Sequence, residues 1–261
     1  EDGKHQAGSG EGDEMRKLII ASILLLAPVL ATAAGGPSVP LQEANIDLAD
    51  QASLQSGAKY YVNYCMGCHS LQYMRYNRMA ADLGIDEVDL RQNLIVDGSK
   101  PGDLMTNAMR PEDGEKWFGT AVPDLTLVTR WRSPDWLYTY LKTFYADPSR
   151  PYGVNNLVFP DVGMPHVLSG LQGVQQPVVE EHQTDDGETV KKVTGVSPAV
   201  GGSMSPEEYD AMVRDLTAFL AYAGEPMQLE RKQLGIYVLL FLGLFFIVAY
   251  ALKKEYWKDV H

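Results

Sequence analysis

Both cysteines of this 261-residue chain lie in one run of five residues, Cys65-Met66-Gly67-Cys68-His69. Two cysteines at this spacing lie on one side of a helical turn, where each thiol can add to one vinyl group of a porphyrin. The histidine that follows can then face the iron as its proximal ligand, so the run is the attachment signature of c-type haem. With no other cysteine, the chain is expected to fold around a covalently held ring and not around a disulfide framework.

Three other interpretations of the motif are weaker. A thioredoxin-like redox pair needs a preceding strand and a different local context. A disulfide between Cys65 and Cys68 would close a loop too small to stabilise the chain much. A zinc site would need a fourth ligand beyond two cysteines and one histidine. The histidine directly after the second cysteine therefore favours haem.

The second axial ligand is less constrained by the sequence. Met164 stands in Phe159-Pro160-Asp161-Val162-Gly163-Met164-Pro165, where proline stiffens the loop and glycine permits close approach to a ring. A thioether there can be held over the iron, and His166, two residues further on, is its main rival. Three more methionines are possible ligands without distinctive surroundings: Met105, Met109 and Met204.

The stretch from Leu234 to Leu252 contains 19 residues without a formal charge. As a helix it would be about 28 Å long, which matches the hydrocarbon thickness of a bilayer. Basic and aromatic residues flank it, as is typical of membrane interfaces: Arg231, Lys232, Lys253, Lys254, Tyr256, Trp257 and Lys258. The sequence therefore predicts a single membrane anchor over residues 229–252.

A secretory signal peptide is predicted over residues 15–33. Met15-Arg16-Lys17 precedes an apolar stretch from Leu18 to Leu30, and an Ala-x-Ala exit follows at residues 31–33. Residues 1–14 form an acidic, Gly-rich extension that this pattern does not explain. Export by the signal and arrest by the anchor would place residues 34–228 in the periplasm of a bacterium. The tail, residues 253–261, would then lie in the cytoplasm.

The formal net charge of −12 is carried by the predicted exported domain. Residues 34–228 hold 26 acidic residues against 14 basic ones. This balance argues against a nucleic-acid binder, because the phosphate backbone attracts the opposite sign. Two interpretations of the charge stay open: it keeps the domain soluble, or it steers a basic electron acceptor to the surface.

Three helices and one hairpin are predicted in the domain. The apolar spacing favours a helix over residues 50–65 that ends at the motif. Ser133-Pro134 begins a second helix, and the capping box at Ser205 begins a third that ends near Gly224 and Pro226. Asp186-Gly187 is the predicted turn of a hairpin over residues 177–194. Residues 97–126 and 146–177 are Pro- and Gly-rich and are expected to be irregular.

In the order of its motifs the sequence resembles the cytochrome c1 family, the haem subunits of ubiquinol–cytochrome c reductase (respiratory complex III). The resemblance covers most of residues 40–261. It consists of the haem motif with Ser70-Leu71, Pro123-Asp124-Leu125-Thr126 with arginines after it, Gly163-Met164-Pro165 and the C-terminal anchor. The haem motif is common to all c-type cytochromes, whereas this order of elements is much more specific.

The resemblance implies a mainly α fold: a class I cytochrome c-like haem domain with long loops, a small β-hairpin insertion and one C-terminal transmembrane helix. It also implies one covalently bound haem c, with His69 and Met164 as the iron ligands. Arg132, or less favourably Arg130, would pair with a haem propionate. The residues expected to line the pocket are Pro123, Trp136 and Phe159.

The function implied by the resemblance is electron transfer. The haem would accept one electron from the Rieske iron–sulfur protein and pass it to a soluble c-type cytochrome, in a dimeric complex with cytochrome b. The chain would not be an enzyme on its own. The alternatives are an anchored cytochrome of a terminal oxidase, a haem peroxidase or sensor with an open distal site, and a membrane-tethered scaffold whose motif holds zinc.

Overall fold

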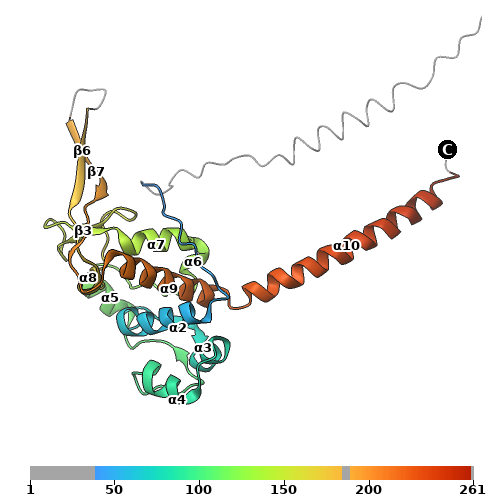
Figure 1. Ribbon diagram of the computed structural model, residues 1–261, viewed down its shortest axis with the longest axis horizontal. Coiled ribbons are helices and arrows are strands. Elements are labelled where there is room, and N and C mark those ends of the chain that lie inside the picture. Colours follow the sequence, from blue (N-terminus) through green and yellow to red (C-terminus); the bar gives the residue numbers. More distant parts are fainter. Residues whose placement is uncertain (1–38, 184–188, 260–261) are drawn as a thin grey trace, which may run out of the picture. The chain divides into compact units, whose positions relative to one another are not determined.

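The computed structural model describes residues 39–183 and 189–259. The predicted signal peptide (15–33), the acidic extension (1–14) and the Asp186-Gly187 turn lie outside the described residues and stay predictions. The described part is mainly helical, with four short pairs of strands and one long C-terminal helix (Figure 1).

The predicted helix over residues 50–65 is confirmed as two consecutive elements. Helix α2 (Gln51–Tyr60) begins at Asp50, whose side chain accepts a hydrogen bond from the backbone of Ser53. It continues into a π-helical turn, η1 (Tyr61–Cys65), which delivers the chain to the haem motif. Such widened turns often occur at functional sites, because they change the direction of the side chains that follow.

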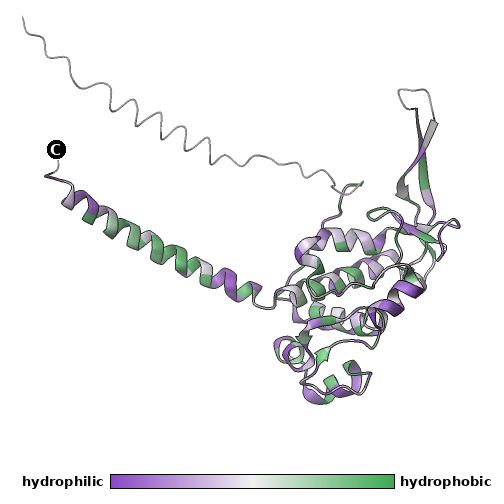
Figure 2. Ribbon diagram, turned by 180° about the vertical axis from the view of Figure 1, so that it is seen from behind, coloured by the Kyte–Doolittle hydropathy of each residue, from purple (hydrophilic) through white to green (hydrophobic). Residues whose placement is uncertain are grey.

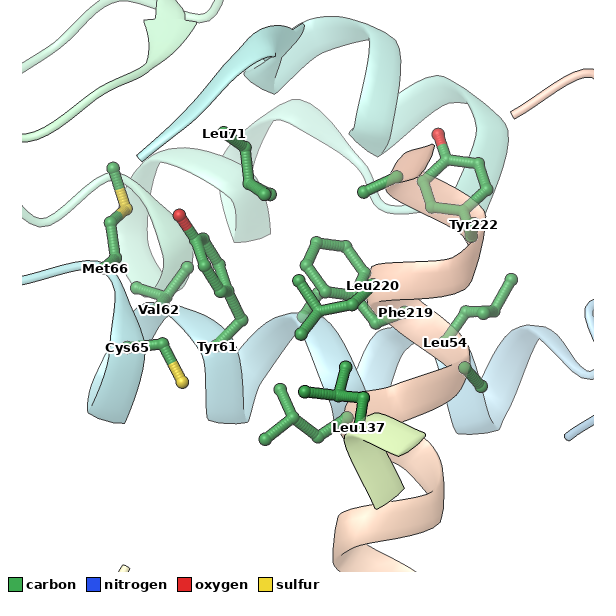
Figure 3. Close-up of a cluster of buried hydrophobic side chains, with 14 of the residues drawn as sticks. Leu54, Tyr61, Val62, Cys65, Met66, Leu71, Leu137, Phe219, Leu220 and Tyr222 are labelled. Carbon is green, nitrogen blue, oxygen red and sulfur yellow. The ribbon is translucent and has the colours of Figure 1, made fainter. Parts of the chain in front are cut away.

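Helix α9 (Pro206–Gly224) begins with the predicted capping box. The Ser205 side chain accepts from the Glu208 backbone, and the Glu208 side chain accepts from the Ser205 backbone. Figure 1 shows α2 and α9 side by side, and Figure 3 shows the buried side chains between them. There the rings of Tyr61 and Phe219 lie 5.6 Å apart.

Helix α7 (Pro134–Lys142) begins at the predicted N-cap, where the Ser133 hydroxyl accepts from the backbone of Trp136. The short helix α6 (Val128–Trp131) precedes it. Both helices are bonded to α9: the Thr129 hydroxyl of α6 donates to the backbone oxygen of Leu220, and two side chains of α7, Tyr138 and Lys142, each donate to Asp210. The three helices therefore hold the motif helix α2 and the segment around Arg132 in one packed body.

The prediction of only three helices in the domain was incomplete. Besides α6, the structure adds α3 (Tyr76–Leu83), α4 (Glu87–Asp89), a π-helical turn η2 (Leu90–Leu94), α5 (Pro111–Phe118) and α8 (Ser169–Gln172). Helix α5 lies inside the segment 97–126 that was expected to be irregular. Its signals were present in the sequence, since Pro111 occupies the first turn and Gly119, with φ of 75°, ends it.

The strands form four separate antiparallel pairs. The predicted hairpin is confirmed as β6 (Pro177–Gln183) and β7 (Thr189–Val196), with Glu181 opposite Lys191. Segment 146–177 contains part of β3 (Phe144–Ala146), all of β4 (Val154–Asn156), and β5 (Gly173–Val174), so it is less irregular than expected. The remaining strands are β1 (Leu71–Arg75), β2 (Leu104–Met105) and β8 (Val200–Gly201).

Helix α10 (Gln228–Tyr256) contains the predicted anchor. Among the described residues it is the one helix long and apolar enough to cross a bilayer, and its apolar residues are exposed. Figure 2 shows a hydrophobic middle between hydrophilic ends. An exposed apolar surface of this length is what a lipid-facing helix presents.

Gly57 of α2 is the point of closest approach between α2 and α9. A Cβ atom built on Gly57 would lie 2.2 Å from the backbone oxygen of Asp215 and 2.6 Å from the Cβ of Phe219. Glycine is therefore required by space, although alanine is the better helix former by about 1 kcal/mol. The two helices are in contact through their backbones at this position.

We predict that Gly57→Ala lowers the free energy of unfolding by about 1–3 kcal/mol, because the clash with a backbone atom outweighs the gain in helix propensity. Urea denaturation followed by circular dichroism measures it. Gly102→Ala is the control, since a Cβ there meets nothing within 4 Å, and its effect is expected to stay within about 0.5 kcal/mol. Equal stability of the two variants would contradict the close packing.

Candidate haem site

The haem motif leaves η1 as a tight, hydrogen-bonded loop. The backbone amides of Cys68 and His69 both donate to the oxygen of Cys65, over 3.0 and 2.9 Å. The hydroxyl of Tyr61 donates to the backbone oxygen of His69 over 2.6 Å, which holds the end of the loop against its beginning. Cys65 is buried and Cys68 is partly exposed, and the two are not joined as a disulfide.

The His69 ring is oriented by a backbone carbonyl. Its Nδ1 lies 2.8 Å from the oxygen of Pro123, so Nδ1 is the nitrogen that carries the proton and Nε2 is the one that can bind a metal. Burial holds the pKa of His69 below its usual value, and the hydrogen bond to Pro123 only partly opposes this. A neutral imidazole is the form that ligates iron.

The segment Pro123–Thr126 is fastened to the exit of the motif. The amide of Leu125 donates to the oxygen of Ser70 over 3.0 Å. The Asp124 carboxylate accepts from the amides of Gln72 and Thr126, over 2.8 and 2.9 Å. These bonds place the Pro123 oxygen where the His69 ring can donate to it.

An apolar crevice opens beside the motif as two adjoining pockets. Four residues line both pockets and so form the boundary between them: Cys65, His69, Pro123 and Met164. The first pocket continues past Cys68 toward Tyr64, Phe118 and Val167, and the second continues toward Trp136, Phe159 and two leucines of α9, Leu216 and Leu220. A flat apolar group between His69 and Met164 would occupy both pockets.

Met164 is positioned by a tyrosine of α7. The hydroxyl of Tyr140 donates to the sulfur of Met164 over 3.3 Å, and the Tyr140 ring stacks on Trp136 at 5.0 Å. His166, the rival ligand, stacks flat against Phe144 with ring centres 4.8 Å apart, and it lines neither pocket. The arrangement favours Met164 as the residue that faces His69.

Arg132 lies among aromatic rings at the wall of the second pocket. Its guanidinium carbon is 4.2, 4.8 and 5.6 Å from the ring centres of Trp131, Trp136 and Phe159. Its Nε is buried without a hydrogen-bond partner. A buried donor at the rim of an apolar crevice fits an anionic group carried by the ligand.

Arg130 does not reach the crevice. It forms an ion pair with Glu225 over 2.8 Å, and Arg231 contacts the same carboxylate. Of the two arginines considered from the sequence, the structure brings Arg132 to the pocket and holds Arg130 at the end of α9.

Tyr61, Asp124 and Tyr140 are site residues that the sequence reasoning missed. Tyr61 and Tyr140 each donate one hydrogen bond to a residue of the site, and Asp124 accepts two from the backbone beside it. The sequence does not indicate such long-range bonds. Among the described residues, no three histidine, cysteine or acidic side chains gather into a cluster that could hold a metal ion. The zinc interpretation therefore finds no donor set in this part of the chain.

A histidine and a thioether that face one apolar crevice beside a Cys-x-x-Cys-His motif are the arrangement expected of a c-type cytochrome. Comparison with known families agrees: a model described as Cytochrome C1 family matches residues 42–172 and 203–260. The chain belongs to the cytochrome c1 family.

Individual relatives extend over nearly the whole chain. Cytochrome c1 of Allochromatium vinosum is 66% identical over 247 residues, which cover 95% of this chain and 100% of that protein. A protein named ammonia monooxygenase gamma subunit, from Nitrosomonas europaea, is 48% identical over 95% of this chain and 99% of its own length. Cytochrome c1 of Rhodobacter capsulatus is 24% identical over 93% and 97%, respectively.

Membership in the family settles the coarse function. Cytochrome c1 is a haem-containing, membrane-anchored electron-transfer subunit of an oxidoreductase complex, and it does not act as an enzyme alone. The class I cytochrome c fold, with one apolar C-terminal helix, agrees with the expectation from the sequence.

We predict that Tyr61→Phe lowers the free energy of unfolding by about 1–2 kcal/mol, because the backbone oxygen of His69 loses its donor. Tyr209→Phe is the matched control, since its hydroxyl also donates to a backbone carbonyl, that of Leu141, over 2.8 Å. Urea denaturation should give similar losses for both variants. Only Tyr61→Phe should also shift the haem absorption spectrum, and an unshifted spectrum would contradict a role in holding the motif.

Proposed function

We propose that this chain is the haem-bearing subunit of a bacterial quinol–cytochrome c reductase. It accepts one electron from the Rieske iron–sulfur protein and passes it to a soluble c-type cytochrome. The observation that carries the proposal is the placement of His69 and Met164 on one apolar crevice beside the two cysteines, in a chain of the cytochrome c1 family.

The residues present fit a covalently attached haem. Cys65 and Cys68 would form the two thioether bonds, and His69 and Met164 would bind the iron from opposite sides. The bond from His69 to Pro123 supports this assignment, because it fixes the ring with Nε2 available. On the distal side, the hydrogen bond from Tyr140 to the Met164 sulfur holds the side chain of Met164 at the crevice.

The haem held there supplies a one-electron iron couple. The protein tunes it by burial, since the crevice is lined by Leu216, Leu220 and aromatic rings that keep water out. With His69 and Met164 both bound to the iron, no position would stay open for a substrate. This favours an electron carrier over a peroxidase or sensor.

Arg132 is proposed to pair with a haem propionate. Its buried, unpartnered Nε and its place among Trp131, Trp136 and Phe159 support the assignment. A guanidinium can hold a carboxylate through two parallel hydrogen bonds, which would orient the ring as well as neutralise its charge. Pro123, Trp136 and Phe159 would line the pocket as the resemblance implies.

The proposed topology follows from the two ends of the chain. The signal sequence at residues 15–33 would export the domain, residues 34–228, into the periplasm. The anchor, residues 229–252, would then leave residues 253–261 in the cytoplasm, with Lys253, Lys254 and Lys258 at that interface. Cytochrome b and the Rieske protein would be neighbours in a dimeric complex.

The main competing function is that of an anchored cytochrome in another electron-transfer complex, such as a terminal oxidase. The cytochrome c1 match favours the reductase. The name of the Nitrosomonas europaea relative refers to a different enzyme, so the choice of complex is best tested directly.

We predict that Met164→Leu, examined in membranes, retains its covalent haem but has a reduction potential that is lower by on the order of 0.1 V or more. The reason is that axial ligands set the potential of a haem over a range of about 0.8 V. Reduction of the soluble c-type cytochrome by quinol should slow accordingly. A reduced-minus-oxidised spectrum with a redox titration measures the first effect, and stopped-flow kinetics measure the second.

Met212→Leu is the control for this experiment. Met212 is a buried methionine of α9 that lines neither pocket, so the same exchange there should leave the potential unchanged. An unchanged potential in Met164→Leu would mean that the distal ligand is another residue. If Met164→Leu lowered the potential as expected but left the quinol-driven reduction of the soluble cytochrome unchanged, the chain would belong to a different complex.

We predict that Tyr140→Phe lowers the reduction potential by about 40 mV, the equivalent of one hydrogen bond of about 1 kcal/mol. Without the donor, a Met164 sulfur bound to the iron would give it more electron density and so stabilise the oxidised state. Tyr222→Phe removes a hydroxyl that donates to Asp82 and should not change the potential. A raised potential in Tyr140→Phe would contradict the direction of this effect.

A further inference from the structure

The loop that carries Met164 is exposed over residues 159–161. Val162 is buried, but Phe159 is 42% exposed and the Asp161 side chain is 78% exposed. Asp161 adopts the left-handed backbone region, with φ of 62°, which among residues other than glycine is entered mainly by asparagine and aspartate. Contacts from outside the loop fix this conformation.

The hairpin of β3 and β4 makes the polar contacts of Asp161, through Arg150 in its turn and Asn155 in β4. Arg150 donates from one terminal nitrogen to the Asp161 carboxylate over 2.9 Å, and from the other to the Asp161 backbone oxygen over 2.8 Å. Asn155, which is buried, accepts from the Asp161 amide over 2.9 Å. The side chain, the amide and the carbonyl of one residue are all engaged.

The β3–β4 hairpin is itself held by side-chain hydrogen bonds. The side-chain amide of Asn155 donates to the Asp147 carboxylate over 3.0 Å, and that carboxylate also accepts from the backbone amide and the hydroxyl of Ser149. On the other side, the buried Asn156 accepts from the amides of Val158 and Phe159 and donates to the oxygen of Tyr140. The β3–β4 hairpin is therefore hydrogen-bonded to α7, whose Tyr140 contacts the Met164 sulfur.

We propose that Arg150 and Asn155 are positioning residues for the distal ligand: they lock Asp161 in its left-handed conformation and so hold Met164 against the iron. The inference rests on the proposed ligation by Met164. Arginine suits the task because its planar fork reaches a carboxylate and a carbonyl at once, whereas a lysine ammonium is a point donor. We call the contacts of Arg150 and Asn155 with Asp161 the clamp. Loss of the clamp would let the loop open locally while the helices stay folded.

The test uses the full chain with haem attached, solubilised in detergent, and compares Arg150→Gln with Arg91→Gln. Arg91 also forms a surface ion pair, with Glu87 on α4, and lines neither haem pocket. Carbon monoxide binds the reduced haem only after Met164 has left. Arg150→Gln should therefore raise the rate of carbon monoxide binding about tenfold, as expected for one lost charge-assisted hydrogen bond.

A second readout separates local opening from unfolding. In urea, the red absorption band that methionine ligation gives to oxidised haem should disappear at lower urea in Arg150→Gln, while the helical circular dichroism shifts no more than in Arg91→Gln. Arg150→Lys keeps the charge but not the planar fork of the guanidinium. Its carbon monoxide binding rate and the urea concentration at which it loses the red band should therefore lie between those of wild type and Arg150→Gln.

Two results would overturn the proposal: Arg150→Gln indistinguishable from Arg91→Gln in both readouts, or Arg150→Lys equal to wild type. Failure of the proposed function would look different. If Met164→Leu kept the red band, Met164 would not be the ligand at all. If Met164→Leu lost the band and Arg150→Gln left it unmoved, ligation would stand and only the clamp would fail.

Discussion

The contact between α2 and α9 at Gly57 is the constraint on which the rest of the structure depends. The backbone oxygen of Asp215 occupies the space that a side chain at Gly57 would need, so the spacing of the two helices is fixed. From α2 the chain passes through η1 into the haem motif, and from α9 Leu216 and Leu220 line the crevice. One helix crossing thus sets the distance between the attachment point and the opposite wall.

The two sides of the crevice are held by different means. On the proximal side Tyr61 is bonded to the motif itself, and Asp124 is bonded to Gln72 shortly after it. On the distal side Met164 follows the exposed residues 159–161, and its supports, Tyr140 and Arg150, come from other parts of the chain. The proposed proximal ligand therefore depends on the folding of α2 and its motif, whereas the proposed distal ligand depends on polar contacts that can open separately.

The sequence predicted the features that have local signals. The haem motif, the N-cap at Ser133 and the capping box at Ser205 each consist of a few adjacent residues whose chemistry is self-contained, and the apolar length of α10 is equally explicit. What it did not predict are contacts between distant segments. Nothing near Tyr140 indicates a methionine 24 residues away, and nothing near Arg130 or Arg132 tells which one faces the crevice. That choice is made by Glu225, which pairs with Arg130 from the end of α9.

The family match divides the chain in a way that agrees with this account. Its two blocks, residues 42–172 and 203–260, contain the motif, Met164, the clamp and the leucines of α9. The interval between them contains β6 and β7, which pair with each other and carry the Glu181–Lys191 ion pair at their surface. Among the described residues, none of this hairpin lines the crevice. The residues proposed to hold the haem therefore all lie in the two matched blocks.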